Sequence, residues 1–92
     1  MFQVWNISAL TSHAPKIRQR WQEPKTSRDE TGACNQARAY SADFWGVFAV
    51  QDETGAVLSV WSDGRDVTRQ NTGVLPVQKW KAAAQAVLDR LA

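Results

Sequence analysis

The stretch that decides the fold runs from Phe44 to Gly64. It reads Phe44-Trp45-Gly46-Val47-Phe48-Ala49-Val50, Gln51-Asp52-Glu53-Thr54-Gly55, Ala56-Val57-Leu58-Ser59-Val60-Trp61 and Ser62-Asp63-Gly64. The first segment is apolar on both faces, which is typical of a central strand. In the second segment, Gly55 can supply the positive φ that closes a short hairpin loop. The sequence therefore predicts an antiparallel hairpin between residues 44–50 and 56–61.

Two further elements follow this hairpin. The pair Asp63-Gly64 favours a two-residue turn and predicts a third, more polar strand from Arg65 to Arg69 at a sheet edge. Beyond Pro76, apolar residues recur every three or four positions, which predicts an amphipathic helix of about four turns. These positions are Val77, Trp80, Ala84, Val87, Leu88 and Leu91. We expect Trp45 and Trp80 in the core.

The N-terminal segment from Phe2 to Ala9 alternates in the manner of a strand. Phe2 and Val4 would face one side of the sheet, and Trp5 and Ile7 the other. A short helix is predicted next, because a hydroxyl cap and an early proline precede two apolar residues spaced four apart. The residues that indicate it are Thr11, Ser12, Pro15, Ile17 and Trp21, and Pro24 ends it.

Residues 22–42 form a polar excursion in this interpretation. A structureless loop of that length is improbable in a small domain, so Ala33 to Tyr40 should hold either a helical turn or the start of a strand. The sequence does not separate these alternatives. The predicted fold is a single α+β domain over residues 1–92. It has two layers, an antiparallel meander of three to four strands against the C-terminal helix, and one short N-terminal helix.

Composition limits the classes of function. The chain has 92 residues, of which 43% are hydrophobic, and 11 Lys and Arg stand against 9 Asp and Glu, leaving a net charge of +2. This charge is well below that of a dedicated nucleic-acid binder. The longest apolar run, Val47 to Val50, is too short to cross a membrane, and no signal-peptide pattern is present. We expect a cytoplasmic protein without a membrane association.

The residues that carry chemistry are few. One cysteine, Cys34, and one histidine, His13, exclude an internal disulfide and a Cys/His zinc site. A Cys34–His13 enzyme is the weakest hypothesis, since a lone cysteine usually packs as a small apolar residue. Acidic pairs occur at predicted turns and loops, where turn chemistry explains them better than catalysis. We therefore expect no enzymatic activity, no metal and no cofactor.

A basic segment lies between residues 16 and 28. Lys16, Arg18, Arg20, Lys25 and Arg28 are opposed only by Glu23 and surround Trp21. Cations interleaved with an aromatic ring suit phosphates and unpaired bases, so this segment could form a nucleic-acid interface. The same residues also fit the solvated face of a short helix whose Ile17 and Trp21 point to the core, and we favour this interpretation.

The five tryptophans indicate a surface for another protein. A single C-terminal helix covers one sheet face, so Trp5 and Trp61 are expected on an uncovered aromatic patch. Trp and Arg dominate interface energetics. The leading hypothesis is a non-enzymatic interaction protein that covers a surface of a partner protein, as bacterial and phage accessory proteins, including anti-CRISPR inhibitors, do. A nucleic-acid-binding module is the alternative function, and a second copy of the chain is a further candidate partner, in a homodimer. The predicted binding residues are Arg18, Arg20, Trp21, Lys25, Arg28 and Trp61.

Overall fold

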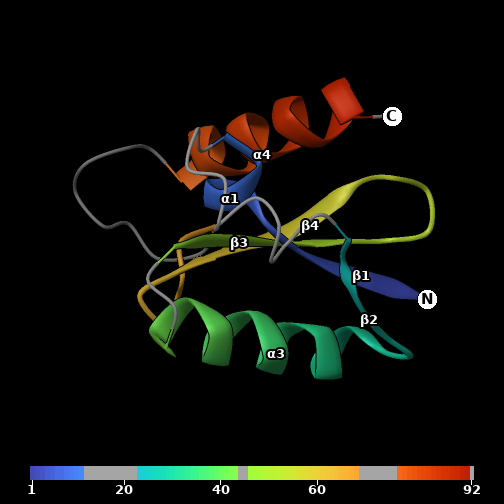
Figure 1. The fold of residues 1–92 in the computed structure, drawn as a ribbon, viewed down its shortest axis with the longest axis vertical. Coiled ribbons are helices and arrows are strands. Elements are labelled where there is room, and N and C mark those ends of the chain that lie inside the picture. Colours follow the sequence, from blue (N-terminus) through green and yellow to red (C-terminus); the bar gives the residue numbers. More distant parts are fainter. Residues whose placement is uncertain (12–22, 44–45, 69–76, 92) are drawn as a thin grey trace.

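The computed structural model describes residues 1–11, 23–43, 46–68 and 77–91 of the chain. Its elements are β1 (Phe2–Asn6), α1 (Ile7–Thr11), β2 (Lys25–Ser27), α3 (Glu30–Asp43), β3 (Val47–Gln51), β4 (Val57–Ser62), β5 (Arg65–Asp66) and α4 (Val77–Leu91). The strands form one antiparallel sheet in the order β2-β1-β3-β4-β5. Helices lie on both of its faces, α3 below the sheet in Figure 1 and α1 and α4 above it.

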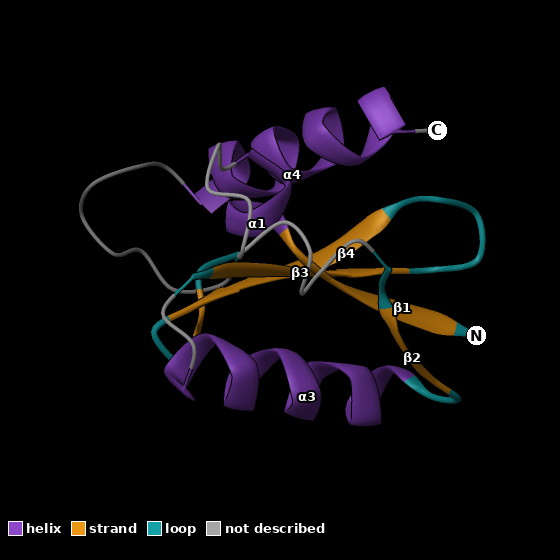
Figure 2. Cartoon of the chain, in the orientation of Figure 1, coloured by secondary structure: helices purple, strands orange, loops and turns teal. Residues whose placement is uncertain are grey.

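The α+β class is confirmed, and Figure 2 shows the sheet between its helices. The meander β3-β4-β5 has β3 at its centre and β5 at an edge, and β1 extends it, as the sequence predicts. The sheet has five strands because Lys25–Ser27 pairs with Phe2–Val4, a strand that the sequence analysis missed. The short N-terminal helix of the structure is α1. The helix predicted between Thr11 and Pro24 falls largely on residues outside the described ranges.

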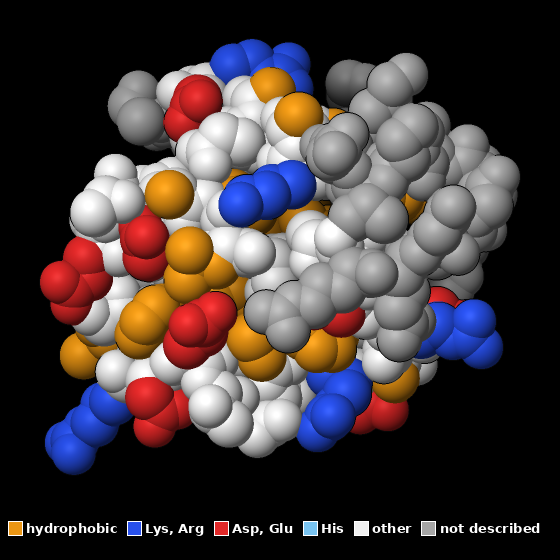
Figure 3. Space-filling view, turned by 180° about the vertical axis from the view of Figure 1, so that it is seen from behind, with side chains coloured by type: hydrophobic (Ala, Val, Ile, Leu, Met, Phe, Trp, Pro, Cys, Tyr) orange, Lys and Arg blue, Asp and Glu red, His pale blue; other side chains and the backbone are white. Residues whose placement is uncertain are grey.

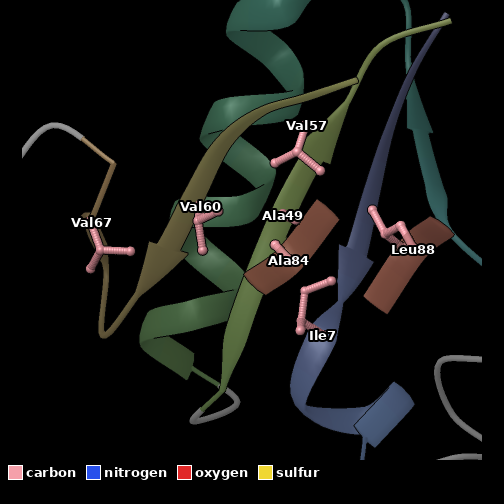
Figure 4. Close-up of a cluster of buried hydrophobic side chains, with 7 residues drawn as sticks. All are labelled: Ile7, Ala49, Val57, Val60, Val67, Ala84 and Leu88. Atoms are coloured by element: carbon pink, nitrogen blue, oxygen red, sulfur yellow. The ribbon is translucent and has the colours of Figure 1, made fainter. Parts of the chain in front are cut away.

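Helix α4 covers one face with the predicted apolar stripe. Ala84 and Leu88 are buried, while Trp80 and Val87 are half-buried against the same cluster. Trp80 thus lies at the core, and Trp45 lies outside the described residues. The stripe packs against side chains from the sheet and from the start of α1 (Figure 4), namely Ile7, Ala49, Val57, Val60 and Val67.

Helix α3 corrects the interpretation of residues 22–42 as a polar excursion. Residues 30–43 are helical, so the helical alternative for Ala33 to Tyr40 is right. Ala33, Ala37 and Ser41 are buried at intervals of four residues, and these small side chains form the face of α3 that meets the sheet. Asp29 begins the helix, because its Oδ1 accepts a hydrogen bond from the Gly32 amide at 2.6 Å.

The second sheet face is therefore covered, which corrects the expectation of an open aromatic patch. Trp61 packs with the cluster between the sheet and α3, whereas Trp5 packs with the cluster between the sheet and α4. The alternation in β1 is confirmed, since Phe2 and Val4 belong to the α3 cluster and Trp5 and Ile7 to the α4 cluster.

The first strand ends earlier than predicted, at Asn6 instead of Ala9. Asn6 is buried, and its Oδ1 accepts a hydrogen bond from the Ala9 amide at 2.9 Å, which caps α1. Ser8 connects this helix to the sheet, because the Val47 amide donates a hydrogen bond to Ser8 Oγ at 2.9 Å. A polar side chain inside an alternating segment thus converts its end into a helical turn.

Both predicted hairpin turns are present. Gly55 has a φ of 90°, and Asp63 and Gly64 have φ values of 54° and 74°. Two consecutive positive φ values define the tight turn that Asp-Gly favours between antiparallel strands. The strand after it is shorter than the predicted range, since β5 covers Arg65–Asp66 only.

A bulge interrupts the pairing of β3 with β4. Val50 pairs with Ser59 and Gln51 with Val57, so Leu58 stands opposite no residue. The extra residue shifts the alternation of β4 by one position. Val57 and Val60 consequently share the α4 face although they are three residues apart, while Trp61 and Ser59 face α3.

Candidate interaction surface

The structure describes three of the six predicted binding residues. Lys25 begins β2, Arg28 follows that strand, and both side chains are exposed. Trp61 on β4 is half-buried, and its indole Nε1 donates to Ser59 Oγ at 3.0 Å. Arg18, Arg20 and Trp21 lie outside the described residues.

Lys25 and Trp61 do not form one cluster. Strands β1 and β3 separate β2 from β4, and neighbouring strands lie about 4.8 Å apart, so the two residues are on the order of 14 Å from each other. Trp61 is also covered by its packing beneath α3. Of the three predicted residues that the structure describes, Lys25 and Arg28 have exposed side chains and lie three residues apart, at the start of β2 and just after it.

The structure adds the outer face of α3 to these two residues. Thr31, Asn35, Ala39 and Ala42 are exposed there, opposite the buried stripe. Only Arg28 and Asp29 separate β2 from α3, and Ser27 Oγ donates to the Asp29 carbonyl at 3.2 Å immediately before the helix begins. We call Lys25, Arg28, Thr31, Asn35, Arg38, Ala39 and Ala42 the β2–α3 surface.

Charge is distributed unevenly over the β2–α3 surface. On α3 the exposed residues of this surface are uncharged except Arg38, which lies between Asn35 and Ala42 on the same face and whose guanidinium donates to Asn35 Oδ1 at 2.9 Å, while Lys25 and Arg28 lie toward β2. Sequence reasoning missed this surface because it did not assign α3. Had residues 30–43 been read as a helix, the spacing of Thr31, Asn35 and Ala42 would have placed them on one face.

Carboxylates accompany the basic residues near β2. Residues 23–30 contain the cations Lys25 and Arg28 and the exposed carboxylates of Glu23, Asp29 and Glu30. This stretch therefore has one more negative than positive charge. Figure 3 shows side chains of both signs interspersed over the described part of the rear face.

Two acidic residues, Asp52 and Asp66, hold the turns in which they lie. Asp52 Oδ1 accepts hydrogen bonds from the Thr54 hydroxyl at 2.6 Å, the Thr54 amide at 2.9 Å and the Ala56 amide at 3.1 Å. The Thr54 hydroxyl, ahead of the backbone amides, holds the pKa of Asp52 below its ordinary value of 3.8. Asp66 similarly accepts from the amide and hydroxyl of Thr68. These contacts support the structural interpretation of the acids.

The single cysteine lies at the junction of α3 and β4. Cys34 is half-buried, and its Sγ is 3.7 Å from Ser59 Oγ, the oxygen that also accepts from Trp61. His13 lies outside the described residues, so the distance between Cys34 Sγ and the His13 ring in the hypothetical pair is not described. Among the described residues, no group of three or more His, Cys, Asp or Glu side chains could hold a metal ion.

A depression of about 320 Å³ lies between the ends of α1 and α4, and its described lining residues are Leu10, Thr11, Val87 and Arg90. Within the described ranges, no helix has the length and apolar character needed to cross a membrane.

Comparisons with known proteins do not assign the chain to a family. No protein-family model matches it, and neither the curated proteins nor the solved structures contain a significant match.

Proposed function

We propose that this chain is a non-enzymatic interaction protein that binds and covers a surface of a partner protein through its β2–α3 surface. A small bacterial or phage inhibitor would act in this way. The observation that supports a protein partner is the outer face of α3, where Thr31, Asn35, Ala39 and Ala42 are exposed and uncharged and Arg38 is the one cation of this helix. Protein interfaces have centres depleted of charged residues and polar rims.

The charges near β2 weigh against the alternative, a nucleic-acid-binding module. Such a module gains its affinity from cations that neutralise phosphates. In residues 23–30, three exposed carboxylates accompany two cations and would repel a phosphate backbone. A protein partner can offer groups of both signs to the same stretch.

Capture of a partner from lysate of the source cell tests the proposal. The bait is the full chain, compared with Ala39→Glu at the centre of the β2–α3 surface and with Ala83→Glu, which changes another exposed alanine, on α4. Burying an unpaired carboxylate in the interface should weaken capture at least about tenfold in Ala39→Glu. Ala83→Glu should retain it, and nuclease treatment should leave it unchanged. Equal capture by both variants would contradict the proposed surface.

A salt titration on duplex DNA separates the two classes of partner. Five phosphate contacts from Lys16, Arg18, Arg20, Lys25 and Arg28 would give a slope of about −4 to −5 for log affinity against log salt. We expect no binding of this kind. Tight binding at low salt with that slope, lost when the five residues are neutralised, would establish the nucleic-acid module instead.

A further inference from the structure

Both ends of the described sheet carry features that oppose the addition of another strand. At one end, β2 is three residues long, follows Pro24 and presents the exposed side chain of Lys25. At the other end, β5 is two residues long, consists of Arg65 and Asp66 and pairs only with the last two residues of β4, so the edge beyond it is the part of β4 that contains the bulge at Leu58. Short strands, charged residues, especially Lys, and proline are the devices by which natural proteins protect sheet edges.

These features limit what an added strand could gain. A strand-adding partner obtains its affinity from main-chain hydrogen bonds along the edge. Pro24 has no amide hydrogen to donate, and three residues offer few backbone groups. The added strand would also remove water from the exposed Lys25 ammonium, which opposes binding unless a carboxylate accompanies it.

We propose that both edges of the sheet formed by the described strands are closed to strand addition, so that the partner of this chain is a folded protein surface held by side chains and not an extended strand. The statement about the partner rests on the proposed function, whereas the closure of the edges does not. Lys25 and Arg28 then contribute as rim charges, and the centre of the contact lies on α3.

The test opens the β2 edge and measures self-association of the purified chain. Pro24→Val with Lys25→Val restores an amide donor, removes the charge and adds a residue type that favours strands. The matched control is Lys81→Val, which exchanges an exposed lysine of α4 for the same apolar residue away from either edge. Sedimentation equilibrium over a concentration series gives the association constant of each protein.

The wild-type chain and Lys81→Val should sediment as single chains, and the double variant should associate at least about tenfold more tightly. Slower hydrogen exchange at the Thr26 amide in the associated form would place the contact on β2. A double variant as monomeric as the wild type would overturn the proposal. So would a wild-type dimer with a protected Thr26 amide, or equal association by Lys81→Val. If the double variant does not fold, Lys25→Thr provides the same comparison with one exposed change. Neither result depends on the capture experiment with Ala39→Glu.

Discussion

Gln85 joins α4 to the β3–β4 hairpin, and Gln85→Ala should destabilise the protein. Its Oε1 accepts a hydrogen bond from the Val57 amide at 2.7 Å, and its Nε2 donates to the Gly55 carbonyl at 2.8 Å and to Asp89 Oδ1 at 3.0 Å. The bulge at Leu58 lies immediately after Val57. The Gln85 side chain therefore provides hydrogen-bond partners for backbone groups of the hairpin where the pairing of β3 with β4 is irregular.

The magnitude follows from what each group retains in Gln85→Ala. Val57 is fully buried, so its amide loses the Gln85 acceptor away from water, which costs about 1–3 kcal/mol. The Gly55 carbonyl keeps the donor Gln51 Nε2 at 3.0 Å, and the bond to the exposed Asp89 contributes little. We expect a loss of about 2 kcal/mol in the free energy of unfolding, or a decrease of about 8–16 °C in Tm.

Gln36→Ala on α3 is the matched control. Gln36 is half-buried, and its Oε1 has no hydrogen-bond partner in the described part of the chain. The two variants share the gain in helix propensity and the loss of side-chain packing, and Gln36→Ala in addition removes a buried oxygen without a partner among the described residues. Gln85→Ala should therefore be the more destabilising of the two, because it alone loses hydrogen bonds. Urea denaturation followed by circular dichroism gives both values. If Gln85→Ala lies within about 0.5 kcal/mol of Gln36→Ala, the reasoning about the hairpin contact is wrong.

Three other perturbations test the fold. Gly64→Ala should cost about 1–2 kcal/mol in urea denaturation, because alanine would adopt a φ of 74° with its Cβ 3.3 Å from Ala42 Cβ. An unchanged midpoint would contradict this strain. The pKa of Asp52 in the folded protein lies below 3.8, so the ionised carboxylate stabilises the fold above that pH. This stabilisation is lost as the pH falls and Asp52 becomes protonated. Melting curves on both sides of pH 3.8 should thus show a shallower acid decline for Asp52→Asn than for the wild type, and parallel declines would refute the linkage. Trp80→Ala should cost about 3 kcal/mol, whereas Trp80→Phe should be nearly neutral because it removes a buried indole N–H without a partner among the described residues. Equal melting temperatures for the two Trp80 variants would show that the ring does not pack as described.

The hairpins and α4 could be predicted from sequence because large apolar residues and turn glycines mark them. Val57 and Val60, the pair Asp63-Gly64 and the stripe through Ala84 and Leu88 are local signals with known periods. Tertiary contacts then use the same residues that the patterns indicate.

The sequence left residues 33–40 undecided between a helical turn and a strand, because the buried face of α3 is made of small residues. Ala33, Ala37 and Ser41 do not produce a strong apolar stripe, although they are fully or almost fully buried. The pairing of β2 could not be predicted either, since Lys25–Ser27 is polar and meets β1 from more than twenty residues away in sequence. The β2–α3 surface depends on both elements, so of its residues only Lys25 and Arg28 were foreseen.

Leu58 is, in effect, an optional residue of β4. Without it, Val57, Ser59, Val60 and Trp61 would alternate regularly and would keep the faces that they occupy now. A deletion would leave the 52–56 turn in place, because Gln51 would still pair with Val57, and would remove only the local bend and added twist that a bulge gives to its strand. The contact between Val57 and Gln85 of α4 would then depend on a straighter β4. The bulge is in this sense a device that sets the angle of the hairpin without changing which residues are buried.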